Sequence, residues 1–129
     1  MDFDRKGKRK RANFYPAFIK SWARLNYQEV EGIFSGDEGL IRAYRPVVKM
    51  LEEARQLAEI LYQRRIRRGA IDLDIPEPKV ELNEEGEPVD IYPRARLFSH
   101  RLVEEFMLQA NQSVAEFLTK KGLLSLIHI

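Results

Sequence analysis

The sequence contains no cysteine and only two histidines, and it has no long apolar run. Without cysteine, disulfide scaffolds, thiol catalysis and cysteine-ligated metal sites are excluded, and the cytoplasm is the expected compartment. No stretch approaches the roughly 18 apolar residues of a membrane span, and the basic start of the chain lacks the apolar core of a secretory signal. We therefore expect a cytoplasmic protein with no membrane partner.

The sequence does contain enough apolar residues for a folded core. Of its 129 residues, 44% are hydrophobic and 33% are charged, which argues against a disordered tail and suits one domain or part of one. The formal net charge is only +2, but six basic side chains lie within the first twelve residues. Such a cluster attracts phosphate backbones, although it also fits an exposed hairpin loop or a ragged chain end.

The first 22 residues predict a hairpin. Gly7, flanked by lysines, marks the turn, and the aromatic and β-branched run over residues 14–22 is typical of a second strand. Pro16 cannot donate to a sheet ladder, so this strand is expected to lie at an edge or to bend at that position.

Two helices are predicted next. Asn26 and Glu29 have the spacing of a capping box at the start of a short helix, and Gly36 and Gly39 are expected to end it. Pro46 suits the first turn of a long amphipathic helix. The apolar stripe of this long helix is Val47, Met50, Leu51, Ala54, Leu57, Ala58, Leu61 and Tyr62.

Four arginines close the long helix, namely Arg64, Arg65, Arg67 and Arg68, directly before Gly69. Cations at the negative end of a helix dipole, followed by a glycine past the cap, explain this arrangement without a ligand. A basic patch that faces RNA is the competing interpretation, and the spacing alone leaves both open.

The second half predicts strands and a last helix. Residues 70–75 alternate apolar and acidic side chains as a strand does, and two further alternating runs surround a turn at residues 83–86. Ser99 can cap the final helix, which Gly122 ends. The predicted apolar stripe of that helix is Val103, Phe106, Met107, Ala110, Val114, Phe117 and Leu118. These elements together indicate an α+β fold.

Few residues suggest catalysis. The sequence has no glycine-rich phosphate loop, HExxH or GxSxG motif. Asp72 and Asp74 share one face of the predicted strand and could hold a divalent metal, but solvated outer positions explain them more simply. Glu104 and Glu105 fall near a helix start, where negative charge is favourable by itself. We predict no catalytic residue, no metal ligand and no small-molecule cofactor within this chain.

Three segments occur in a suggestive order: ARLNYQEV, then RRGAIDLDIPE, then SHRLVEEFMLQAN. They resemble the middle of the catalytic RNB domain of the ribonuclease II and ribonuclease R family, and the resemblance covers most of residues 3–123. It implies a partial RNB-type fold in which amphipathic helices pack against antiparallel strands. It also implies that the parent protein is a 3′→5′ exoribonuclease, which hydrolyses RNA phosphodiester bonds with Mg²⁺ and releases nucleoside monophosphates.

The resemblance also implies an RNA-binding site. Tyr27 and Glu104 match positions by which the family is thought to hold the ribose near the RNA 3′ end, and a phenol and a carboxylate can both hydrogen-bond a 2′-hydroxyl. Without the resemblance, Tyr27 reads as a packed first-turn residue. Arg64 and Arg65 are further candidate RNA contacts. Leu73 stands where some members carry a stacking aromatic ring, so base clamping there would be weaker.

The family's aspartate-rich metal motif would precede Met1, and its phosphate-stabilising arginine would follow Ile129. We therefore expect a truncated piece, in which residues 1–123 are the central part of an RNB domain that is inactive alone and binds no metal. Residues 124–129 match one translated frame of a common transposon-end sequencing adapter, and we expect a non-native tail there. An ordinary apolar terminal strand is the alternative.

Two other functions stay open. The chain could be a standalone, non-catalytic RNA-binding module that uses its basic start and residues 64–68, in which case its RNA affinity would fall steeply with salt. It could also be a helical interaction module with no nucleic-acid role. RNA is the expected partner, and the sequence gives no indication of oligomeric state.

Overall fold

A computed structural model describes residues 1–71, 78–93 and 96–123. Its elements in order are β1 (Asp2–Phe3), β2 (Arg9–Arg11), α1 (Tyr27–Phe34), α2 (Glu38–Ala43), α3 (Arg45–Arg67), β3 (Pro78–Leu82), β4 (Pro88–Pro93) and α4 (Phe98–Lys120). The strands form two antiparallel hairpins, β1–β2 and β3–β4. The predicted α+β class is confirmed.

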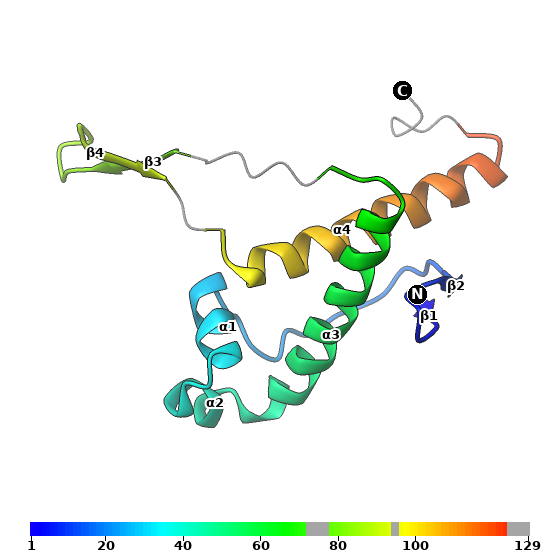
Figure 1. Cartoon of the computed structure of the whole chain (residues 1–129), viewed down its shortest axis with the longest axis horizontal. Coiled ribbons are helices and arrows are strands. Elements are labelled where there is room, and N and C mark those ends of the chain that lie inside the picture. The colour runs from blue at the N-terminus through cyan, green and yellow to red at the C-terminus, as the bar shows by residue number, and fades with distance from the viewer. Residues whose placement is uncertain (72–77, 94–95, 124–129) are drawn as a thin grey trace.

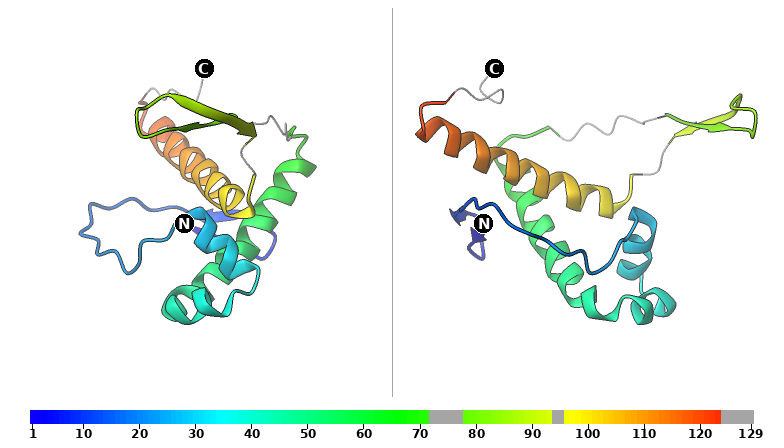
Figure 2. Two further views of the ribbon diagram at one scale, coloured as in Figure 1. Left: turned by 90° about the vertical axis from the view of Figure 1, so that its left-hand side faces the viewer. Right: turned by 180° about the vertical axis from the view of Figure 1, so that it is seen from behind.

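The two long helices, α3 and α4, cross at the centre of the molecule (Figure 1). Helix α1 packs against both of them, and α2 lies between α1 and the start of α3 (Figure 2). The apolar core side chains are Ile33, Leu51, Ala58, Leu61, Leu102 and Ala115. The small side chains of Ala58 and Ala115 allow close packing between elements, because a larger residue would hold the backbones apart.

Local sequence signals set the helix ends as predicted. The Asn26 side chain accepts a hydrogen bond from the Glu29 amide at 2.8 Å, and the Glu29 carboxylate accepts from the Asn26 amide at 2.7 Å, which completes the capping box of α1. Pro46 lies in the first turn of α3. Gly69 follows α3 with a φ of +91°, a conformation that suits glycine.

The structure corrects two predictions in the first half. Residues 12–26 form no helix or strand, and the side chains of Phe18 and Trp22 are almost fully exposed. A strand needs a neighbouring strand for its ladder, and β1 is too short to pair beyond Arg11. The prediction also missed α2, which Asp37 caps by accepting from the Leu40 amide at 3.0 Å. Gly39 therefore lies inside α2 and does not end α1.

Ser99 does not cap α4, contrary to the prediction. The cap is Leu97, whose amide donates to His100 Nδ1 at 3.1 Å. Ser99 lies one residue inside the helix and is buried, with its amide donating to the Glu31 carboxylate at 3.0 Å. Its hydroxyl donates to the Tyr27 carbonyl at 2.9 Å. Ser99 therefore joins the start of α4 to α1.

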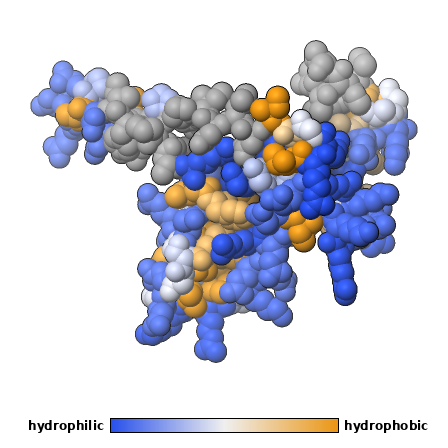
Figure 3. Space-filling view, viewed as in Figure 1, coloured by the Kyte–Doolittle hydropathy of each residue, from blue (hydrophilic) through white to orange (hydrophobic). Residues whose placement is uncertain are grey.

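The predicted apolar stripe of α4 is also wrong in part. Val103, Met107, Val114 and Phe117 are exposed. The buried positions of α4 are Ser99, Leu102, Glu105, Ser113 and Ala115, a face that is rotated relative to the prediction. On this face Ser99 is hydrogen-bonded to α1, Glu105 to Arg65 of α3, and Ser113 to Arg9 of β2. Figure 3 shows apolar side chains at the surface over α1 and the N-terminal half of α4.

The β3–β4 hairpin forms as predicted, with its turn at residues 83–86. Gly86 has a φ of +82°, and the Asn83 side chain accepts from the amides of Glu85 and Glu87 at 3.0 and 2.8 Å. This hairpin extends away from the helices, whereas the β1–β2 hairpin is hydrogen-bonded to α3 and α4 (Figures 1 and 2). Most of the strand predicted over residues 70–75 lies outside the described residues.

Candidate nucleic-acid interface

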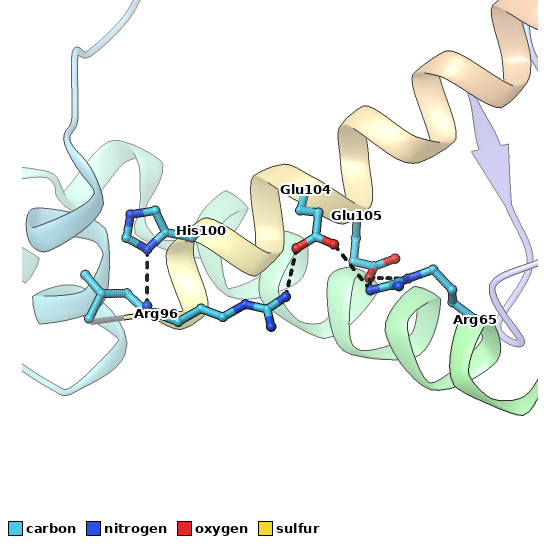
Figure 4. A network of polar contacts seen from close by, with 6 residues as sticks. Arg65, Arg96, His100, Glu104 and Glu105 are labelled. Carbon is cyan, nitrogen blue, oxygen red and sulfur yellow. Dashed lines mark hydrogen bonds and ion pairs between the residues drawn. The ribbon is translucent and has the colours of Figure 1, made fainter. Parts of the chain in front are cut away.

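Two carboxylates and two arginines form a network at the start of α4 (Figure 4). Arg65, in the last turn of α3, places Nη2 at 2.7 Å and Nε at 2.9 Å from the same Glu105 oxygen. Its Nη2 also lies 3.4 Å from Glu104, and Arg96 Nη2 lies 3.2 Å from the other Glu104 oxygen. Glu105 is 1% exposed, whereas the Glu104 side chain is 42% exposed. Arg65 therefore compensates a buried charge and holds an exposed one.

Glu104 keeps the capacity to bind a ligand. Its two arginine contacts, at 3.4 and 3.2 Å, are longer than the roughly 2.7–2.9 Å of strong charge-assisted hydrogen bonds. An ionised carboxylate offers about four acceptor sites. Glu104 can therefore accept a hydrogen bond from a ligand hydroxyl while both arginines stay in place.

Tyr27 lies on the same side of α4 as Glu104. As the first residue of α1 it is 40% exposed, and its ring packs on His100 with 4.1 Å between ring centroids and 30° between ring planes. His100 and Glu104 are four residues apart, so they share one face of α4. The Ser99 hydroxyl fixes the backbone of Tyr27 from the same helix. The structure thus brings the two predicted ribose contacts to the same face of α4, with Tyr27 packed and accessible at once.

The two candidate arginines point to different partners. Arg65 binds the carboxylates of α4, whereas Arg64 Nη1 donates to the Gly7 carbonyl at 2.5 Å. Gly7 is buried with a φ of +71°, and a Cβ there would lie 2.8 Å from Ile60 Cγ2. Arg64 therefore ties the turn of β1–β2 to α3. Direct RNA contacts by either arginine stay predictions.

A cavity of about 660 Å³ lies between the β1–β2 hairpin, the end of α3 and the C-terminal half of α4. Its lining residues are Lys8, Arg9, Arg64, Arg68, Gln109, Gln112, Ala115, Glu116, Thr119 and Lys120. Five of these side chains are cationic and one is anionic. Each basic cluster can be recognised separately in the sequence. Local sequence patterns do not predict the packing that brings the clusters together.

The carboxylates at the start of α4 do not fit a magnesium site, because Arg65 and Arg96 already neutralise Glu104 and Glu105. Within the described ranges, no three potential metal ligands lie together. Asp72 and Asp74 fall outside those ranges. In the same part of the chain, no helix has both the length and the apolarity of a membrane span.

Sequence reasoning missed the partners that orient the site. The contact between the His100 and Tyr27 rings joins residues 73 positions apart, which no local pattern indicates. No sequence signal near Arg65 or Glu105 predicts that these two residues pair across two helices. The four-residue spacing of His100 and Glu104 was the one signal that placed two of these residues on a common face.

Comparison with known proteins decides the family. The profile of the RNB domain matches residues 1–129. The chain belongs to the RNB domain family. The resemblance inferred from the three sequence segments is confirmed.

RNB relatives share both the sequence and the fold of this chain. Ribonuclease R of Thermotoga maritima is 43% identical over 124 residues, and that of Aquifex aeolicus is 39% identical over 122. Both alignments cover 95% of this chain and 17% of the relative. RNase R of Mycoplasma genitalium, solved in complex with ribose methylated single-stranded RNA, superposes with a TM-score of 0.82 at 27% identity. That match covers 93% of this chain and 18% of the other.

Proposed function

We propose that this chain forms part of the RNA channel of a 3′→5′ exoribonuclease of the ribonuclease R type. Membership of the RNB family and the similarity to ribonuclease R sequences support this assignment. The observation that carries it is that Tyr27 of α1 packs on His100, which shares one face of α4 with Glu104. A hydroxyl that both donates and accepts and a carboxylate that only accepts are both suited to recognition of a ribose 2′-hydroxyl.

The same proposal assigns roles to the ends of the chain. Residues 1–123 are the central part of the RNB domain, and residues 124–129 are a non-native tail. The coverage of only 17% of two relatives supports a longer parent protein. The exposed side chains of Phe18 and Trp22 support it as well, because large apolar groups of this kind usually contact further protein.

Divalent metal would be held elsewhere in the longer protein, by carboxylates that this chain does not supply in the described ranges. When bound, Mg²⁺ would activate the attacking water and stabilise the leaving oxygen. The residues of this chain have a different task in the proposal. Tyr27 and Glu104 fix the ribose, and Arg65 keeps the Glu104 carboxylate oriented.

The test measures discrimination between RNA and DNA. Fluorescence anisotropy would compare a 12-nucleotide single-stranded RNA with the DNA of the same sequence. Tyr27→Phe and Glu104→Gln each remove one hydrogen-bonding capacity, so the preference for RNA is expected to fall about 3- to 10-fold. Tyr15→Phe and Glu53→Gln are matched controls on exposed positions outside α1 and α4, and they should leave the preference unchanged.

Two results would contradict the proposal. Equal affinity of the unmodified chain for RNA and DNA would show that it does not recognise the ribose. An unchanged preference for RNA in both variants would show that Tyr27 and Glu104 do not contribute to that recognition. Sequencing the gene locus without a transposon adapter tests the truncation separately. An open frame that continues past both ends, with codons 124–129 absent, is expected. Stop codons directly around the chain would instead favour the standalone RNA-binding module.

A further inference from the structure

The cationic cavity is built by three separate parts of the chain. Lys8 and Arg9 come from the β1–β2 hairpin, Arg64 and Arg68 come from the end of α3, and Lys120 comes from the end of α4. Among the described residues of the lining, Glu116 is the only one with a carboxylate.

Two of the cations anchor the hairpin to the helices. Arg9 donates to the Ser113 hydroxyl at 2.5 Å and pairs with Glu116, and Arg64 donates to the Gly7 carbonyl. These contacts fix the walls of the cavity. They also neutralise the single negative charge of the lining, since Glu116 is paired with Arg9.

The other three cations, Lys8, Arg68 and Lys120, are exposed and have no acidic partner in the part of the chain that the structure describes. Helix dipoles explain why Arg68 and Lys120 lie at helix ends. They do not explain Lys8, which the hairpin brings to the same cavity. Like charges held around one concave surface repel each other, so the arrangement favours a bound anion.

We infer that this cavity binds the phosphate backbone of a single-stranded nucleic acid, at Lys8, Arg68 and Lys120. Cationic side chains on separate elements can each meet a different phosphate of one strand. The amide side chains of Gln109 and Gln112 add donors and acceptors for sugar or phosphate oxygens. A volume of about 660 Å³ lies within the range of ordinary ligand sites.

This phosphate site is separate from the ribose site, although it rests on the proposed RNA-binding function. Glu104 and Glu116 are twelve residues apart in α4, which corresponds to about 18 Å along the helix axis. One strand can therefore lie along α4, with its sugars read at one end and its phosphates held at the other. Phosphate contacts do not distinguish RNA from DNA, whereas a contact between Tyr27 and the ribose 2′-hydroxyl does.

The test combines three substitutions, Lys8→Gln, Arg68→Gln and Lys120→Gln, in the 129-residue chain. For every phosphate that is no longer neutralised, the slope of log K against log salt should become shallower by about 0.7. We therefore expect a total decrease of about 2 in the slope and, relative to binding at about 1 M salt, roughly 100-fold weaker binding than the unmodified chain near 0.1 M salt, equally for RNA and DNA. The control combines Lys20→Gln, Arg42→Gln and Lys49→Gln, which remove the same charges from exposed sites outside the cavity. Its affinity should change less than twofold.

The outcomes separate this inference from the proposed function. If the unmodified chain does not bind RNA, the proposed function fails; if it binds and the cavity and control variants weaken equally, only the cavity assignment fails. Acetylation of lysines, measured by mass spectrometry with and without RNA, needs no variant. Lys8 and Lys120 should be protected by RNA and Lys49 should not, and equal reactivity at all three would overturn the inference.

Discussion

Arg65 clamps the buried carboxylate of Glu105 through two nitrogens, at 2.7 and 2.9 Å from a single oxygen. The other Glu105 oxygen is buried and has no hydrogen-bond partner within the described residues, so Arg65 supplies the charge compensation seen there. Since the same guanidinium contacts Glu104, the stability of the α3–α4 crossing and the orientation of a proposed ribose contact depend on one side chain.

Removal of Arg65 should therefore destabilise the fold strongly. Arg65→Ala leaves a buried carboxylate unpaired, and we expect a loss of about 3–5 kcal/mol in the free energy of unfolding, measured by urea denaturation. Arg67→Ala, at an exposed position of the same helix turn, should change that free energy by less than about 0.5 kcal/mol. Equal effects of the two substitutions would show that the buried pair contributes little.

Glu29 should make the stability of α1 sensitive to acid. The Asn26 amide and then the Tyr44 hydroxyl donate to its carboxylate, and together they lower its pKa below 4.5. A carboxyl whose pKa is lower in the folded state stabilises the fold above its unfolded pKa, and this contribution is lost as pH falls through the lowered value. The melting temperatures of the unmodified chain and Glu29→Ala should therefore differ most above the ordinary pKa of a glutamate carboxyl and converge as the pH falls through the lowered pKa of Glu29. Glu53→Ala, on an exposed carboxylate, should show no such convergence.

Among the glycines with positive φ in the described residues, Gly7 should be the least replaceable. Gly7→Ala combines an unfavourable φ of +71° with a Cβ only 2.8 Å from Ile60 Cγ2. Gly36→Ala isolates the backbone effect, because Gly36 has a φ of +88° with open space around it. Urea denaturation should give a loss of about 1 kcal/mol for Gly36→Ala and at least twice that for Gly7→Ala. RNA affinity should also fall in Gly7→Ala although no charge is removed, and an unchanged affinity would mean that the hairpin position is irrelevant to binding.

His100 should act as a positioning residue for Tyr27. His100→Asn removes the ring that packs on Tyr27, whereas His100→Phe keeps a ring and loses the nitrogen that accepts from the Leu97 amide. The RNA-over-DNA preference should fall about threefold or more in His100→Asn and should be retained in His100→Phe. The melting temperature serves as the second readout, because loss of the cap should lower it in His100→Phe. A preference for RNA that is retained in His100→Asn and lost in His100→Phe would show that the hydrogen bond of the cap, and not the ring contact, is responsible.

Elements with local signals could be predicted from the sequence. The capping box at Asn26, the proline at the start of α3 and the turn at Asn83 each act within a few residues, and all three lie where expected. The aromatic run over residues 14–22 has strand composition, but composition supplies no pairing partner, and the run forms no strand. Strand formation depends on a second segment, which local reasoning does not place.

The site could be predicted only in part. Tyr27 and Glu104 came from the resemblance to the RNB family, and their placement on one face of α4 agrees with a shared task. The rotation of α4 could not be predicted, because the apolar residues Val103 and Met107 outrank Ser113 by hydropathy and yet remain outside. Ser113 is buried where Arg9 of β2 and Met1 contact it, and this tertiary contact leaves no signal in the sequence of α4 itself.

The β3–β4 hairpin shares no contact with the helices among the described residues, so its opening does not require the helical core to unfold. An isolated two-stranded hairpin is only marginally stable in water. Its amide protons should therefore exchange with solvent deuterium through local opening, with a free energy far below that of global unfolding, whereas amides at the α3–α4 crossing should report the global value. The chain then consists of two cooperative units, and a bound strand or a neighbouring domain can order the hairpin without changing the stability of the helices.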